Sequence, residues 1–164
     1  MKKITLLFLA LTCCWVGVNG QTGTGKSATA KTQKTEAARR RVVRLPGSQP
    51  NGIFSPAIVT GDLVFTSGQI GVDSKTGQLV EGGIEAQTEQ VFRNLEAVLE
   101  AAGSSTEHIL KATVFLADMA DYNVMNELYR KHFKGDPPAR TTVQVARLPR
   151  DARIEIEAIA ILKR

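Results

Sequence analysis

The last stretch of the chain constrains the fold most, because its two faces differ so clearly in polarity. Residues 154–162 alternate with a period of two, as the side chains of a β-strand do. The first face holds Ile154, Ile156, Ala158 and Ala160, and the second holds Glu155, Glu157, Ile159 and Ile161. This pattern predicts a strand in a sheet that is covered on one face and carries carboxylates toward one end of the other.

The order of the other elements predicts an α+β domain. The clearest helix spans Ile84–Ala102, whose apolar residues recur on one stripe and which ends before Gly103, a residue typical of a C′ cap. A second helix is expected from a cap at Asp121 to about Phe133, and its expected inward residues are Val124, Met125, Leu128, Tyr129 and Phe133. Strands are expected at 42–45, 63–72, 109–117, 141–146 and 154–162, with a bulge or a close backbone approach at Gly68. Together these elements predict a mixed sheet with two helices on one face, while a second chain could cover the other face.

The first 41 residues are expected to lie outside this domain. Residues 1–20 have a basic start, an apolar run and small residues before Gly20, which is typical of a secretory signal peptide. Residues 21–41 hold no large apolar side chain and predict a flexible basic tether. The domain is then 42–164, exported to a periplasm or secreted, with membrane contact only through the signal. Lipid attachment at Cys13 or Cys14 and a retained anchor are weaker alternatives.

Charge and cysteine content exclude several functions. The net charge is +5, yet eight basic side chains and one acid lie in residues 1–41, so the domain itself carries a net −2. Such a domain gives no electrostatic footprint for nucleic acid. Both cysteines lie in the signal, which excludes cysteine nucleophiles and zinc fingers from the mature chain. Residues 20–27 match the P-loop spacing, but they sit between signal and tether rather than between a strand and a helix, so we reject a phosphate site.

Two charged residues within the final strands are candidates for chemistry. The stretch from Arg140 to Glu155 is expected to form two strands joined by a turn, and both residues are set in otherwise apolar β-sequence. A guanidinium can donate two hydrogen bonds to one carboxylate, and a half-buried glutamate can activate water. On pattern alone, solvated charges at a sheet rim are the more frequent explanation for two such residues.

Five motifs, read in order, resemble the RidA/YjgF family of reactive-intermediate deaminases. They are Thr66–Ile70, Lys111–Asp118, Val124–Tyr129, Pro138–Thr141 and Arg153–Ala158, and the resemblance extends from Val42 to the C-terminus. It implies a chorismate-mutase-like mixed sheet with a homotrimeric barrel core and ligand sites between subunits. It also implies an enzyme of the 2-iminobutanoate/2-iminopropanoate deaminase type. Such a hydrolase acts on C=N bonds and converts small 2-imino or enamine acids to 2-oxo acids and ammonia, with no metal or organic cofactor.

The resemblance assigns roles to individual residues. Arg140 is expected to clamp the substrate carboxylate and Glu155 to orient water, as the catalytic pair. The expected substrate-binding residues are Ser67, Gly68, Asn126, Thr142 and Phe54. Phe54 stands where the family commonly has tyrosine, and Thr142 stands where many members have cysteine.

Other interpretations remain open at this point. A protein of the same fold could bind small carboxylates without turning them over, and ribonuclease activity has been ascribed to some relatives. The acidic domain and the lack of a histidine constellation argue against the latter. His108 and His132 are expected to be solvated or capping residues, and Glu157 is a candidate ion-pair partner for Arg153 or Arg147.

Overall fold

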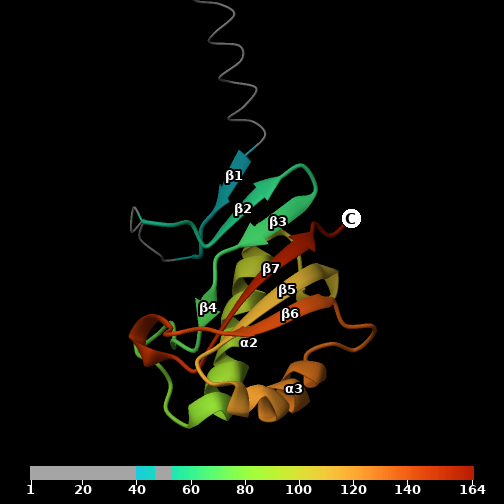
Figure 1. Ribbon diagram of the computed structural model, residues 1–164. Helices are drawn as coiled ribbons and strands as arrows, with labels where there is room; N and C mark the ends of the chain where they lie inside the picture. The colour runs from blue at the N-terminus through green and yellow to red at the C-terminus, as the bar shows by residue number, and fades with distance from the viewer. Residues whose placement is uncertain (1–39, 47–52) are drawn as a thin grey trace, which may run out of the picture.

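The computed structural model describes residues 40–46 and 53–164, and one mixed sheet organises them (Figure 1). Its strands are β1 Arg40–Val43, β2 Ala57–Thr60, β3 Leu63–Thr66, β4 Gln69–Ile70, β5 Ile109–Leu116, β6 Ala139–Gln144 and β7 Ile154–Ile161. The order across the sheet is β1-β2-β3-β7-β5-β6, and the short β4 continues beside β7. All pairings are antiparallel except β5 with β6, which is parallel. The predicted mixed sheet is confirmed.

Two helices cover one face of this sheet, as predicted. Helix α2 spans Gly83–Ala102 and lies along the sheet, while α3 spans Tyr122–Lys131 and packs beside the lower part of α2 (Figure 1). The predicted cap of the first helix is confirmed, because Gly103 adopts a φ of 90° at its C-terminus. Among the helices that the structure describes, none has the length and apolar character needed to span a membrane.

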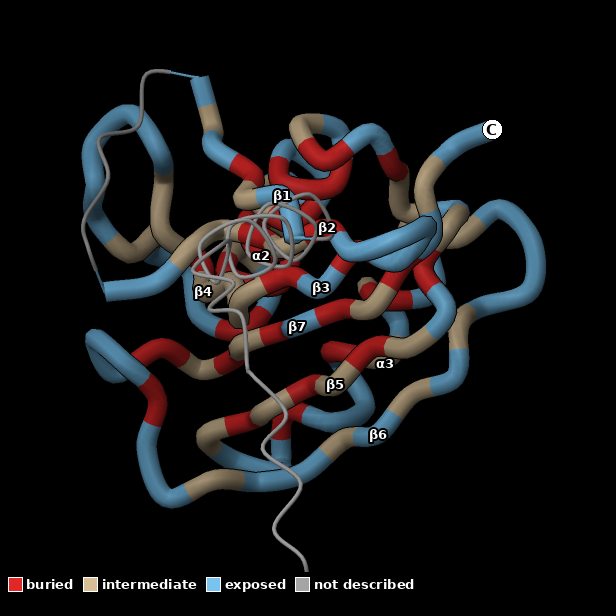
Figure 2. The backbone as a smooth tube through the Cα atoms, turned by 90° about the horizontal axis from the view of Figure 1, so that it is seen from above, coloured by how far each residue is buried: buried red, intermediate tan, exposed pale blue. Residues whose placement is uncertain are grey.

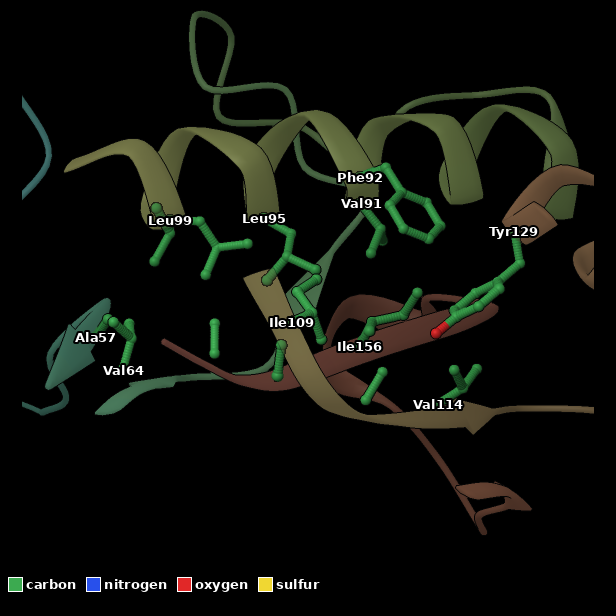
Figure 3. Packing of buried hydrophobic residues seen from close by; sticks show 14 of the residues in the cluster. Ala57, Val64, Val91, Phe92, Leu95, Leu99, Ile109, Val114, Tyr129 and Ile156 are labelled. Atoms are coloured by element: carbon green, nitrogen blue, oxygen red, sulfur yellow. The ribbon is translucent and has the colours of Figure 1, made fainter. Parts of the chain in front are cut away.

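The core lies between α2 and the sheet. Leu95 and Leu99 of α2 are fully buried and face Val64, Val114 and Ile156 of the strands (Figure 3). Burying aliphatic side chains of this size contributes about 1.5–3 kcal/mol each. The apolar stripe read from the sequence therefore forms the main layer contact.

The sheet's other face has no covering layer within the described residues. Burial alternates along β5 and β7, as the alternating colours of these strands show (Figure 2). On the helix side of β7 every residue is buried, whereas on the open side Phe65 and Ile161 remain 39% and 37% exposed. The alternation predicted for residues 154–162 is confirmed, and an apolar surface remains on the open side.

The second helix differs from its prediction in three details. It ends at Lys131 rather than at about Phe133, and Val124 is 37% exposed rather than inward. Asp121 precedes the helix but gives it no side-chain cap, because its Oδ2 accepts a hydrogen bond from Arg153 Nε at 2.7 Å and forms an ion pair with Arg153 Nη2 at 2.7 Å. With ten residues beside a sheet edge, α3 buries a narrower stripe than its sequence pattern suggested.

The two C-terminal strands are not partners of one another. Strand β5 lies between β6 and β7, because β6 runs parallel to β5 on its far side.

The expected ion pairs of Glu157 with Arg153 or Arg147 are wrong, since Arg153 pairs with Asp121 and Arg147 with Asp151. At the other end of the sheet, β1 begins at Arg40, two residues before the predicted domain boundary. The predicted signal and almost all of the tether lie outside the described residues.

Candidate active site

The guanidinium of Arg140 is held by helix α3. Its Nη2 donates a hydrogen bond to Asn126 Oδ1 at 2.6 Å, and its Nη1 lies 3.9 Å from Met125 Sδ. The guanidinium carbon sits 4.5 Å from the ring centre of Tyr129 and 5.9 Å from that of Tyr122. One hydrogen bond and two aromatic faces therefore fix the direction of this side chain.

Helical spacing and strand register together build this arrangement. Asn126 and Tyr129 are one turn apart on α3, so they present a single surface toward β6. Arg140 is the register partner of Ala112, a fully buried residue on the helix side of the sheet. The arginine consequently points from the edge strand toward α3.

Within the described part of the chain, Arg140 forms no ion pair with a carboxylate. Arg147 and Arg153, by contrast, each pair with an aspartate at 2.7 Å. A guanidinium carries five N–H donors, and α3 engages only part of them. The rest suit a planar anion such as a carboxylate, which can accept two parallel bonds.

The carboxylate of Glu155 lies against the backbone of Gly68. A Cβ atom at Gly68 would meet Glu155 Cδ at 2.7 Å, so only glycine leaves room for this side chain. The close backbone approach predicted at Gly68 is confirmed. Burial raises the pKa of Glu155, and the neighbouring charge of Glu157 raises this pKa further. A carboxylate with a raised pKa is a better proton acceptor.

Ser67 ties this group to the segment that contains Phe54. Its Oγ donates to the carbonyl oxygen of Ser55 at 2.7 Å, and its backbone N–H donates to that of Pro56 at 2.9 Å. Phe54 is the preceding residue, and its side chain is 60% exposed. Ser67, Gly68 and Glu155 are thus brought together, with Phe54 close by along the chain.

The predicted site residues fall into two groups on opposite sides of the sheet. Ala112 is in register with Arg140 and with Ala158, so all three share the helix side. Phe115, three residues further along β5, is in register with Glu155. Because strand side chains alternate, Glu155 lies on the open side, and one chain does not bring the two predicted catalytic residues together.

We name these groups the clamp group and the carboxylate group. The clamp group consists of Arg140, Asn126 and Thr142, which lies two residues after the arginine and therefore on the same side of β6. The carboxylate group consists of Glu155, Gly68, Ser67 and Phe54. Thr142 Oγ1 is buried and has no hydrogen-bond partner among the described residues.

Sequence reasoning missed the aromatic surroundings of Arg140. Tyr129 and Met125 were expected only as core residues, and Tyr122 was not singled out. Their spacing carries a signal, because positions 122, 125, 126 and 129 share one helix face. Tyr122 and Tyr129 lie about one turn from Asn126 on that face, so the position of Asn126 in the sequence also predicts theirs.

The histidines have structural roles within the described residues. The ring of His132 stacks on Phe92 with a centroid distance of 3.8 Å, and its Nε2 lies 3.4 Å from Glu89. Burial lowers the pKa of His132, although Glu89 opposes that shift. His108 Nδ1 is hydrogen-bonded to Ser105 Oγ at 2.7 Å. Residues 40–46 and 53–164 contain no cluster of His, Asp and Glu side chains that could hold a metal ion.

Comparison with known proteins decides the family. A family model described as Endoribonuclease L-PSP matches residues 46–162. The chain belongs to this family, that of RidA and YjgF.

Three members illustrate the similarity. A RutC family protein of Pyrococcus horikoshii is 51% identical over 112 residues, which are 68% of this chain and 89% of that protein. The human 2-iminobutanoate/2-iminopropanoate deaminase is 44% identical over 125 residues, or 74% of this chain and 90% of the relative. The crystal structure of Escherichia coli TdcF with bound serine shares the fold, with a TM-score of 0.67 and 36% identity. It covers 75% of this chain and 99% of its own.

Proposed function

We propose that the protein hydrolyses small 2-imino acids and their enamine tautomers to 2-oxo acids and ammonia. The observation that carries this proposal is Arg140, a guanidinium fixed by Asn126 and Tyr129 and without a carboxylate partner among the described residues. Such a group is suited to bind the carboxylate that every 2-imino acid carries. The human relative that is named a 2-iminobutanoate/2-iminopropanoate deaminase supports the same chemistry.

The proposed reaction needs positioning and proton transfer. Water adds to the electrophilic imine carbon, and Glu155 accepts one of its protons as the C–O bond forms. The carboxyl returns that proton to nitrogen, which gives a carbinolamine. The carboxylate then accepts the proton of the new hydroxyl and passes it to the amino group, so that the C=O bond forms as the C–N bond breaks and ammonia leaves a 2-oxo acid. Arg140 holds the substrate carboxylate throughout, so that the reacting carbon stays beside the water.

We further propose that each site combines the clamp group of one chain with the carboxylate group of another. Two observations support this arrangement, since the groups face opposite sides of the sheet and the open side exposes Phe65 and Ile161. A closed homotrimer would cover that apolar surface and give three equivalent sites. The family resemblance favours the same assembly.

The test is ammonia release from 2-iminobutanoate generated in situ, with the spontaneous hydrolysis subtracted. We expect Arg140→Ala to lower kcat/KM by at least about 100-fold, because a hydrogen-bonded charge contact to the substrate is lost. Arg140→Lys keeps the charge without the fork and should recover only part of the activity. Arg130→Ala, on the exposed side of α3, is the matched control and should behave as wild type. Wild-type activity in Arg140→Ala would reject the assignment.

Two competing activities are decided by the same preparations. The family description names an endoribonuclease, so RNA cleavage by protein lacking residues 1–39 is measured in parallel. His108 is hydrogen-bonded to Ser105 and His132 stacks on Phe92, so these contacts involve no residue of the clamp or carboxylate group, which favours imine hydrolysis. Binding of 2-oxobutanoate without turnover of any imino acid would instead support a non-catalytic carboxylate-binding protein.

We also propose that the protein is exported. The support is the sequence of residues 1–20, with a basic start, an apolar run and small residues before Gly20. Cell fractionation with N-terminal sequencing tests it, and a mature chain starting at Gln21 is the expected result. Full-length protein in the cytosol would overturn the proposal.

A further inference from the structure

The ring of Tyr129 lies beneath the guanidinium of Arg140. The guanidinium carbon is 4.5 Å from the ring centre, which is within the range of a favourable cation–π contact. Tyr129 is itself buried, at 4% exposure, and extends from α3 toward the sheet (Figure 3). The contact therefore joins the proposed substrate clamp to the core of the protein.

Two other aromatic rings hold the tyrosine in place. Phe92 of α2 packs edge-on against it with a centroid distance of 5.4 Å, and Phe133 lies at 4.9 Å. Because these neighbours belong to different segments, the Tyr129 ring cannot rotate or retreat without disturbing the contact between the helices. It is a rigid support rather than a mobile surface side chain.

We propose that Tyr129 is a positioning residue, whose ring face sets the plane of the Arg140 guanidinium for a substrate carboxylate. This inference rests on the proposed function for the identity of the anion. The hydrogen bond from Arg140 to Asn126 fixes one end of the fork, and a single bond still permits the planar group to turn about it. A ring face beneath the guanidinium restricts that rotation. The N–H groups that do not bond Asn126 therefore keep one orientation.

The ring face, and not the hydroxyl, is the operative part. Among the described residues the Tyr129 hydroxyl has no hydrogen-bond partner, and burial raises its pKa to about 12. The phenol is therefore neutral at physiological pH and donates nothing to Arg140. Phenylalanine at this position should preserve the effect, and an aliphatic residue should remove it.

The kinetic test compares three variants in the imine hydrolysis assay. Tyr129→Leu removes the ring face, and we expect KM to rise by about two- to thirty-fold, the range that a cation–π contact represents, with a smaller change in kcat. Tyr129→Phe should keep the wild-type KM. Leu99→Val is the control for core packing, because Leu99 is fully buried on α2 and lies outside the aromatic cluster of Phe92, Tyr129 and Phe133. If Tyr129→Leu does not fold, Tyr129→Met replaces it.

A second measurement does not depend on turnover. In a spectrum of 15N-labelled protein, the Arg140 guanidinium signal is assigned by its loss in Arg140→Lys. We expect ring shielding to move this signal upfield in wild type and in Tyr129→Phe. In Tyr129→Leu most of the shift should be lost, because only the more distant ring of Tyr122 remains. Affinity for 2-oxobutanoate, measured by calorimetry, should weaken in parallel with KM.

These readouts separate the two proposals. If the wild type releases no ammonia, the proposed function fails. The guanidinium signal and the affinity for the 2-oxo acid still test the role of Tyr129. If the wild type is active and Tyr129→Leu keeps its KM and its shielded signal, the positioning role is wrong and the function stands. An equal rise of KM in Leu99→Val would also overturn the proposal, since loss of core packing alone would then explain it.

Discussion

Arg140 and Glu155 lie on opposite faces of one sheet, and strand β5 separates the strands that carry them. A substrate of a few carbon atoms cannot reach both side chains of a single chain through a packed sheet. The two residues can serve one reaction only if copies of the chain exchange halves of the site. Under the proposed function, this geometry requires an assembly of chains for catalysis, which leads to the first prediction.

Mixing two inactive variants should restore activity. Arg140→Ala keeps the carboxylate group and Glu155→Gln keeps the clamp group. If the proposed trimer forms, some sites between unlike chains in mixed trimers would contain both intact groups. With equal amounts and random assembly, about one quarter of the sites would carry both residues. The measurement is imine hydrolysis after the two variants are unfolded together and refolded.

Each variant refolded alone serves as the control for that experiment and should remain inactive. A mixture that stays as inactive as its components would show that the site does not combine the two groups from different chains.

Replacing Glu155 by glutamine should stabilise the protein while removing activity. The pKa of Glu155 is raised on folding by burial and by Glu157, so the folded chain holds this proton more tightly than the unfolded chain does. The contribution of this bound proton to folding stability is complete below the ordinary pKa of 4.5. It is lost as the pH rises through the raised pKa of Glu155. At pH 7 the ionised side chain is therefore a cost that glutamine does not carry.

Denaturant unfolding of wild type and Glu155→Gln at equal protein concentration checks this expectation. The free energy of unfolding should be higher for the variant at pH 7, and the difference should vanish toward acid pH. We expect kcat/KM to fall by about 100-fold or more, as when a general base is removed. A variant that is less stable at pH 7 would contradict the cause assigned to the shift.

The acid limb of the pH–rate profile should reveal the same carboxylate. Glu155 must be ionised to accept a proton, so kcat/KM should fall with decreasing pH around a value above 4.5. Glu157→Gln removes the neighbouring charge and should move this limb to lower pH. Glu100→Gln, on the exposed side of α2, is the matched control and should leave the limb in place. If the acid limb stays at the same pH in Glu157→Gln, the titrating group is not Glu155.

A methyl group at Gly68 should displace the carboxylate of Glu155, the proposed proton acceptor. The added Cβ would meet Glu155 Cδ at 2.7 Å and Cγ at 2.9 Å, and the flexible glutamate is the partner that can move. We expect Gly68→Ala to lower kcat strongly with only a modest loss of thermal stability. Activity and melting temperature are measured together.

Gly135→Ala is the matched control for that variant, because nothing lies within 4 Å of its Cβ position. It should retain wild-type activity. Full activity in Gly68→Ala would show that Glu155 does not need the position it occupies against the glycine.

Much of the fold could be predicted because its signals are local. The alternation in residues 154–162 and the stripe of Ile84–Ala102 report directly which faces are buried. The close approach at Gly68 was likewise predictable, since glycine in a strand often marks such a contact. These features depend on neighbouring residues and the period of the element.

The relation between the two groups could not be predicted in the same way. Two strands joined by a turn suggest a hairpin, and only the parallel pairing of β6 with β5 shows that Arg140 faces α3. The pairing of Asp121 with Arg153 joins residues 32 positions apart. The sequence alone predicted that the Asp121 carboxylate caps a helix. Strand pairing and contacts between residues far apart in the sequence depend on how all the strands assemble into the sheet.

The position of β6 at the end of the sheet has a consequence for how the protein behaves at low abundance. If Arg140 on this strand works only with a second chain, the amount of functional catalyst follows the law of mass action rather than the amount of polypeptide. Dilution would then lower activity per milligram, and a cell that makes little of the chain would have disproportionately little enzyme.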